Sequence, residues 1–145
     1  MHFAKERIKA GLVGLMFGLL SQTSMAELVV VVSAKNPLAA LNEHQVADIF
    51  LGRTSDFPSG GEAMPIDQAE NSASRAEFYL KTTGKSPSQL KAYWSKLIFT
   101  GSGQPPREVS DAAEVKKALN AILNSVGYID RSELDSSVKV VLMLH

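Results

Sequence analysis

Apolar residues lie along this chain partly in short continuous runs and partly at helical intervals. The runs cover residues 28–32, 126–129 and 138–144, the last of which includes Lys139, and a shorter one covers 64–66. A continuous run rich in β-branched residues is typical of a strand covered on both faces, whereas a strand with one face in water alternates between apolar and polar residues. The runs therefore predict buried strands in a layered α/β domain.

Four segments between these runs have the spacing of helices with one apolar face. Each begins with a pair of residues that can form helix-capping hydrogen bonds, and Gly52 and Gly84 stand where two of the helices should end. We expect surface connections over residues 53–63, 101–106 and 130–137. The capping pairs are Asn42 with Gln45, Ser74 with Glu77, Ser86 with Gln89, and Asp111 with Glu114. The apolar residues of the helices are Val46, Ile49 and Phe50; Phe78, Tyr79 and Leu80; Leu90, Tyr93, Trp94, Leu97 and Ile98; and Val115, Ala118, Leu119, Ile122 and Leu123.

Residues 1–26 have the three parts of a secretory signal peptide. Lys5, Arg7 and Lys9 form a basic start, residues 10–20 are an uninterrupted apolar run, and residues 24–26 provide small side chains at the cleavage positions. The alternative is a retained membrane anchor, but an apolar helix of this length covers roughly 16 Å, about half of a hydrocarbon core. We therefore expect cleavage after residue 26, a single periplasmic domain over residues 27–145, and no stable membrane insertion after cleavage.

Composition argues against several classes of function. The chain carries 15 basic and 15 acidic residues and is slightly acidic without residues 1–26, which disfavours a nucleic-acid surface. It has no cysteine, so disulfides, thiol catalysis and thiolate metal sites are excluded. His2, His44 and His145 form no pair at metal-ligand spacing. Because no Ser-His-Asp or paired-carboxylate arrangement stands out either, we expect no enzymatic activity, no cofactor and no metal site.

A series of short motifs follows the order found in a known family. The motifs are Leu41-x-x-x-Gln45-x-x-x-Ile49-Phe50-Leu51-Gly52, Ser72-x-Ser74-Arg75 before Phe78, Trp94, Phe99-Thr100-Gly101 and Val126-Gly127-Tyr128-Ile129. In this order they resemble the phosphate-binding-protein family of type II periplasmic solute-binding proteins, which are components of ABC importers. The resemblance implies a single three-layer lobe of that fold, with a central, mostly parallel or mixed sheet and helices on both faces.

The resemblance also implies a binding site. In the family, an Arg-x-Asp-x-Ser-Gly-Thr turn holds the oxyanion at a helix N-terminus, where backbone N–H groups and the helix dipole attract negative charge. Gln68 stands in place of the arginine, and Arg75 is the residue that could replace that cation in pairing with phosphate. The resemblance thus implies binding of inorganic phosphate or another small oxyanion for ABC-type uptake, with an ABC permease as partner. The candidate ligand-binding residues are Gln68, Glu70, Ser72, Ala73, Ser74 and Arg75.

A second interpretation keeps this scaffold without the ligand. A lobe that once faced another lobe would expose a surface that could bind a protein partner or a second copy of the chain, with phosphate binding lost. On this interpretation Ser72 and Ser74 are ordinary capping residues and Arg75 is a solvated charge. Trp94 is expected in the core rather than on a sugar-binding surface, and His44 is expected to face solvent.

Overall fold

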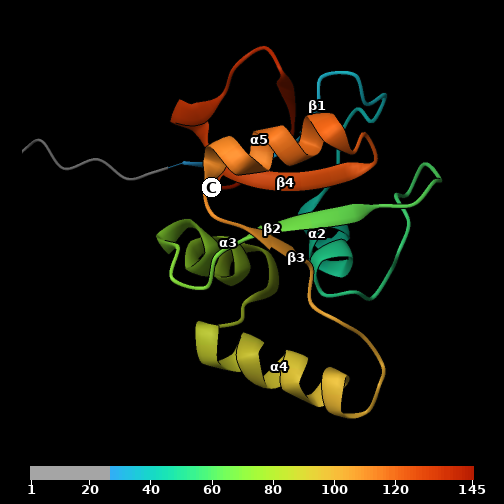
Figure 1. Ribbon diagram of the computed structural model, residues 1–145, viewed down its shortest axis with the longest axis vertical. Helices are drawn as coiled ribbons and strands as arrows, with labels where there is room; N and C mark the ends of the chain where they lie inside the picture. The colour runs from blue at the N-terminus through green and yellow to red at the C-terminus, as the bar shows by residue number, and fades with distance from the viewer. Residues whose placement is uncertain (1–26) are drawn as a thin grey trace, which may run out of the picture.

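The computed structural model describes residues 27–145, so the predicted signal peptide, residues 1–26, lies outside the described residues. The strands of the described part form one sheet, and the helices lie around it (Figure 1). Their bounds are β1 (Leu28–Ser33), α2 (Glu43–Phe50), β2 (Met64–Gln68), α3 (Ala73–Thr83), α4 (Pro87–Phe99), β3 (Arg107–Val109), α5 (Ala112–Ala121), β4 (Ser125–Asp130), the 3₁₀ turn η1 (Arg131–Glu133) and β5 (Val138–Met143).

The sheet has five strands in the order β3-β2-β4-β1-β5. β2 runs parallel to β3 and β4, whereas β1 runs antiparallel to β4 and β5. Every residue of β1 is buried, as its continuous apolar run predicts for a strand covered on both faces. The prediction of a mixed sheet is confirmed.

Helices cover both faces of the sheet, and each face has its own apolar core. α5 lies over one face, while α2 and α3 lie over the other with α4 beyond them (Figure 1). The period of two along β1 divides its valines between the cores: Val29 and Val31 pack with α5, and Val30 and Val32 pack with the other helices. The three-layer α/β architecture with helices on both faces is therefore confirmed.

Three of the predicted capping pairs lie at helix starts. In α2 and α4 the first residue of the pair accepts a hydrogen bond from the backbone of the second, and the second side chain accepts one from the backbone of the first. In α5 the Asp111 side chain accepts from the Glu114 N–H. The pairs of α2 and α4 are Asn42 with Gln45 and Ser86 with Gln89.

The start of α3 differs from the predicted pair. Its cap is Ser72, whose hydroxyl accepts from the Arg75 N–H, and both Ser74 and Glu77 lie inside the helix. Ser72 is held in this position because its hydroxyl also donates to the side chain of Gln68, the last residue of β2. A contact between two elements, which local spacing does not reveal, thus selects the cap.

Two further differences concern short or terminal segments. No element was predicted for residues 107–109, which are largely exposed and form no apolar run. They form β3 because they pair with β2. α5 ends at Ala121, earlier than the apolar spacing implied, since Ile122 has an extended backbone and Leu123 is 48% exposed.

The burial of Trp94 and the exposure of His44 agree with the expectations from the sequence. Trp94 is 6% exposed and lies in the core on the α2–α3 side, and the His44 side chain is 81% exposed. Leu80 and Ile98, which the helical spacing had grouped with buried neighbours, are 58% and 55% exposed. Their helices are covered on one side only, so the flanks of the apolar stripes remain in water.

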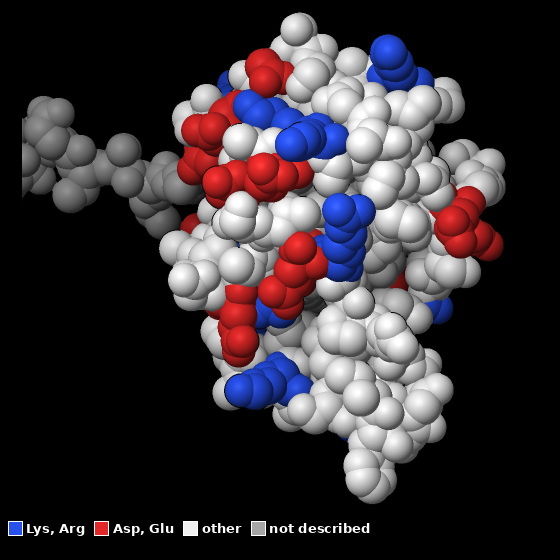
Figure 2. Space-filling model, in the orientation of Figure 1, with Lys and Arg blue, Asp and Glu red and all other residues white. Residues whose placement is uncertain are grey.

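The described surface is uneven in its charge. On the face shown in Figure 2, charged side chains of both signs gather over α3 and α5, whereas the surface over α4 and the loop after it is largely uncharged. Within residues 27–145, no helix combines the length and the apolar character needed to cross a bilayer.

Candidate ligand-binding site

The predicted site lies at the carboxyl end of β2. β2 ends at Gln68, a turn follows in which the Ser72 N–H donates to the Ala69 carbonyl at 2.9 Å, and α3 begins at Ala73. α5 begins close by, and together these segments border a hollow of about 570 Å³, which we call the α3–α5 hollow. Its lining residues are Gln68, Asn71, Ser72, Ser74, Ser110, Asp111, Ala112, Ala113, Asp130 and Glu133.

The structure brings three of the predicted residues together in this hollow, namely Gln68, Ser72 and Ser74. The other three are not among its lining residues. Glu70 is exposed in the turn, Ala73 is exposed as the first residue of α3, and Arg75 is the third residue of that helix.

Gln68 and Ser72 are bonded within the protein. The Gln68 Nε2 donates to the carbonyl of Tyr128 in β4 at 2.9 Å, and its Oε1 accepts from the Ser72 Oγ at 2.9 Å. The same Ser72 Oγ accepts from the Arg75 N–H at 3.4 Å. These bonds hold the turn against β4 and cap the N-terminus of α3. The two side chains therefore fix the position of the segments around the hollow in addition to lining it.

Arg75 pairs with a buried carboxylate. Its Nε lies 3.3 Å from the Oδ2 of Asp67, and the two side chains are 12% and 1% exposed. The Asp67 carboxylate also accepts from the hydroxyls of Tyr79, at 2.7 Å, and Tyr128, at 2.5 Å, and from the Gln68 N–H, at 2.8 Å. Arg75, the residue predicted to replace the missing arginine, is therefore already paired inside the protein.

This network fixes the charge states of its members. Burial, followed by the negative charge of Asp67, raises the pKa of both Tyr79 and Tyr128 well above the usual value, so the tyrosines remain neutral donors. Burial alone would lower the pKa of the Arg75 guanidinium, but the charge of Asp67 offsets it and the pKa is raised. Phe78 stacks on Tyr128 with ring centroids 3.9 Å apart, which holds that tyrosine in place.

The α3–α5 hollow has acidic walls. Asp111, Asp130 and Glu133 line it, and no lysine or arginine is among its lining residues. The Asp111 side chain accepts from the Glu114 N–H at 3.0 Å, and Asp130 accepts from the Ser132 N–H at 2.9 Å. The carboxylate of Asp111 thus already complements the positive end of the α5 dipole. Despite these acids, no cluster placed to hold a metal ion occurs among residues 27–145.

Sequence reasoning missed Asp67 and the acidic wall. Asp67 was missed because the predicted strand ended at residue 66, whereas β2 continues to Gln68 and carries Asp67 into the interior, where a carboxylate requires partners. No local signal could identify the acids of the wall, since Asp111 belongs to α5 and Asp130 to the end of β4, and only the sheet order brings them beside α3.

No protein-family model and no curated protein matches this chain. Solved structures match it by fold. An ABC-type phosphate transport receptor from Vibrio cholerae superimposes with a TM-score of 0.63 at 20% identity, over 80% of this chain and 45% of that chain. PstS from Borrelia burgdorferi superimposes with a TM-score of 0.61 at 14% identity, over 80% of this chain and 46% of that chain.

These matches establish the fold. Residues 27–145 have a periplasmic-binding-protein-like fold, and the structural neighbours are phosphate receptors of ABC transport. The chain spans less than half the length of the structures that it matches. The likeness in fold that the motifs predicted is therefore confirmed, and it covers one part of a longer receptor.

Proposed function

We propose that this chain is an exported solute-binding-protein-like domain that binds a small oxyanion, with phosphate as the first candidate, in the α3–α5 hollow. One observation carries the proposal: the N-terminal ends of two helices line the same hollow, with the cap Ser72 and Ser74 from α3, and Ala112 and Ala113 from α5. The N–H groups of a first helical turn have no partner within the helix and attract anions. That this fold is shared with phosphate receptors supports the choice of ligand.

The acidic wall restricts the form of oxyanion that fits. Asp111, Asp130 and Glu133 would repel a dianion, whereas an oxyanion that keeps a proton can donate a hydrogen bond to a carboxylate. We therefore propose that diprotonated phosphate, which is a monoanion, is bound, and that binding strengthens as the pH falls below neutral. Sulfate, which carries no proton at these pH values, is the matched ligand that should not bind.

Calorimetric titration of the purified protein with phosphate and with sulfate tests this proposal. We expect saturable heat with phosphate only, and Ser74→Ala should weaken binding about tenfold because a hydroxyl donor to a charged group is lost. Ser95→Ala, on the exposed surface of α4, is the control and should leave the affinity unchanged. Absence of heat at millimolar phosphate on either side of neutral pH would contradict the proposal.

A second candidate function is supported by the pairing of Arg75 with Asp67. Because that cation is used internally and the hollow has acidic walls, the same face suits a cationic group on a protein partner or on a second copy of the chain. This domain would then be a periplasmic interaction module that has lost phosphate binding. Sedimentation velocity separates the two candidates: a salt-sensitive dimer together with no phosphate heat selects the module, and a monomer that binds phosphate rejects it.

The cellular setting belongs to the same proposal. We propose that residues 1–26 are removed as a signal peptide, that the single domain 27–145 acts in the periplasm without enzymatic activity, and that an ABC permease receives its ligand. The basic start and apolar run of residues 1–26 support export. N-terminal sequencing of the protein from a periplasmic extract should give Glu27 as the first residue, and an intact N-terminus in the cytoplasm would contradict export.

A further inference from the structure

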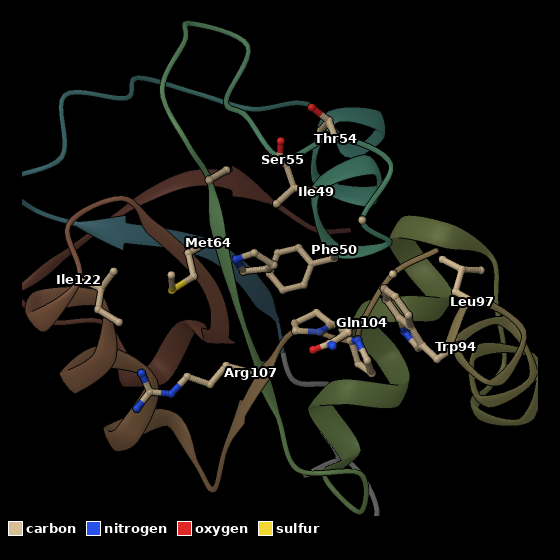
Figure 3. A pocket seen from close by; sticks show the side chains of 16 residues that line it. Ile49, Phe50, Thr54, Ser55, Met64, Trp94, Leu97, Gln104, Arg107 and Ile122 are labelled. Atoms are coloured by element: carbon tan, nitrogen blue, oxygen red, sulfur yellow. The ribbon is translucent and has the colours of Figure 1, made fainter. Parts of the chain in front are cut away.

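Two cavities lie at opposite ends of β2 and differ in their chemistry. The larger has a volume of about 610 Å³ and is lined mainly by apolar side chains, among them Ile49, Phe50 and Leu97 (Figure 3). The α3–α5 hollow is lined instead largely by hydroxyl, amide and carboxylate groups. A small polar ligand therefore fits the hollow, and the selectivity of the hollow depends on which of its groups donate hydrogen bonds and which accept them.

The direction of the hydrogen bonds at Gln68 is fixed from β4. The carbonyl of Tyr128 can only accept, so the Gln68 side chain must turn its Nε2 toward that carbonyl, at 2.9 Å. Its Oε1 then faces Ser72, and because this oxygen cannot donate, the Ser72 hydroxyl must donate to it, at 2.9 Å. Gln68 is only 5% exposed, so its amide has little contact with water that could reverse this direction.

The hydroxyl hydrogen of Ser72 is thereby used within the protein. The Ser72 Oγ also accepts from the Arg75 N–H at 3.4 Å, which leaves it able to accept one more hydrogen bond and to donate none. Ser72 is half-buried and lines the hollow. An oxyanion that keeps a proton can therefore donate to Ser72, whereas an ionised oxygen at the same place would face only a lone pair.

We propose that Gln68 is a specificity-determining residue of the α3–α5 hollow, because it fixes Ser72 as an acceptor and so favours oxyanions that carry a proton. This inference rests on the proposed function, the binding of an oxyanion in the hollow, and adds a determinant outside the acidic wall. The wall repels negative charge throughout the hollow, whereas Ser72 favours a proton at one position of the ligand. Ser72 can therefore distinguish between ligands of equal charge.

Two ligands of the same shape and charge separate this role from charge repulsion. Below neutral pH, methylphosphonate and methanesulfonate are both tetrahedral monoanions with one methyl group, but only methylphosphonate carries an O–H group. The purified protein is titrated with each by calorimetry. We expect saturable binding of methylphosphonate and about tenfold weaker binding of methanesulfonate, because methanesulfonate has no proton to donate to Ser72.

Gln68→Met removes the acceptor and frees the Ser72 hydroxyl to donate to the ligand. We expect this variant to reduce the preference for methylphosphonate about tenfold, mainly by strengthening the binding of methanesulfonate. The double variant Gln68→Met with Ser72→Ala should lose that gain, since the freed hydroxyl is absent. Gln104→Met makes the same change at an exposed glutamine in the wall of the apolar cavity (Figure 3) and should leave the preference unaltered.

A second single variant, Ser72→Ala, keeps the test decisive if circular dichroism shows that Gln68→Met does not fold. It leaves Gln68 bonded to Tyr128 and should reduce the preference by weakening methylphosphonate alone, whereas loss of a donating hydroxyl would weaken both ligands alike. An unchanged preference in either variant, when folded, would overturn the role of Gln68 while phosphate binding stands. Failure of the original protein to bind phosphate or methylphosphonate would overturn the proposed function as well.

Discussion

Asp67 is the residue on which the interior beside the α3–α5 hollow depends. It is 1% exposed, and its carboxylate accepts hydrogen bonds from Tyr79, Tyr128, Arg75 and the Gln68 backbone. A buried charge is tolerated only when such partners replace the lost water. Asp67 thus holds together side chains from α3 and β4 at the end of β2.

Replacing this carboxylate should therefore be costly. We predict that Asp67→Asn lowers the free energy of unfolding by about 3 kcal/mol, because Arg75 keeps its charge and loses its partner. Urea unfolding measures the change. Tyr79→Phe, which removes one of the donors and no charge, should cost about 1 kcal/mol, and equal effects of the two variants would contradict the central role of Asp67.

The two buried tyrosines predict a loss of stability at alkaline pH. Burial and the charge of Asp67 raise their pKa in the folded protein, whereas in the unfolded chain each releases its proton near about pH 10. The buried tyrosines therefore contribute their full stabilisation of the folded protein below that pH. Above it, the free energy of unfolding falls by up to about 1.4 kcal/mol per pH unit for each tyrosine. Denaturant unfolding across this range should show the decline, and Tyr128→Phe should reduce its slope. An unchanged slope would contradict the prediction.

At the scale of elements, Gly127 determines how closely α5 packs on the sheet. A Cβ on Gly127 would lie 2.8 Å from the Val115 side chain, closer than carbon atoms approach one another. We predict that Gly127→Ala destabilises the protein by about 1–3 kcal/mol, because α5 must move away from β4. Thermal unfolding measures this. In a double-mutant cycle, Gly127→Ala should cost less in the Val115→Ala background than in the original protein, and an equal cost in both backgrounds would mean that the clash has another origin.

The helices and strands differ in how well the sequence predicted them. Long elements with strong local signals were predicted: the valine run gave β1, and reciprocal caps gave the starts of α2 and α4. β3 was missed because its strand state depends on pairing with β2 rather than on its own residues. The cap of α3 was displaced from Ser74 to Ser72 by a bond to Gln68, which is likewise a contact between elements.

For the candidate site, sequence reasoning located the turn but could not show how its side chains are used. Gln68, Ser72 and Ser74 do line the hollow. The pairing of Arg75 depends on Asp67, and the acidic wall depends on α5 and the end of β4, so both follow from the packing of separate elements. The binding role of the six predicted residues stays a prediction until ligands are tested.

For the whole molecule, one sheet is shared by both apolar cores, which predicts a single cooperative unfolding transition. Val30 and Val31 are neighbours in β1 and belong to different cores, so neither core can lose its strands alone. Unfolding followed by Trp94 fluorescence, which reports on one core, should coincide with unfolding followed by circular dichroism. A fluorescence change at a lower denaturant concentration would show instead that α4 detaches as a separate unit.

The position of β1 also bears on how the chain is made. β1 comes first in the described chain, yet its neighbours in the sheet are β4 and β5, so that Leu28 pairs with Asp130 and Val29 with Met143. A ribosome adds about 5–20 residues per second, so the first strand remains without partners for on the order of ten seconds. The centre of the sheet therefore closes only after nearly the whole chain has been synthesised. For a protein that leaves the cytoplasm, as we propose, this delay keeps the nascent chain in the unfolded form that a secretion channel accepts.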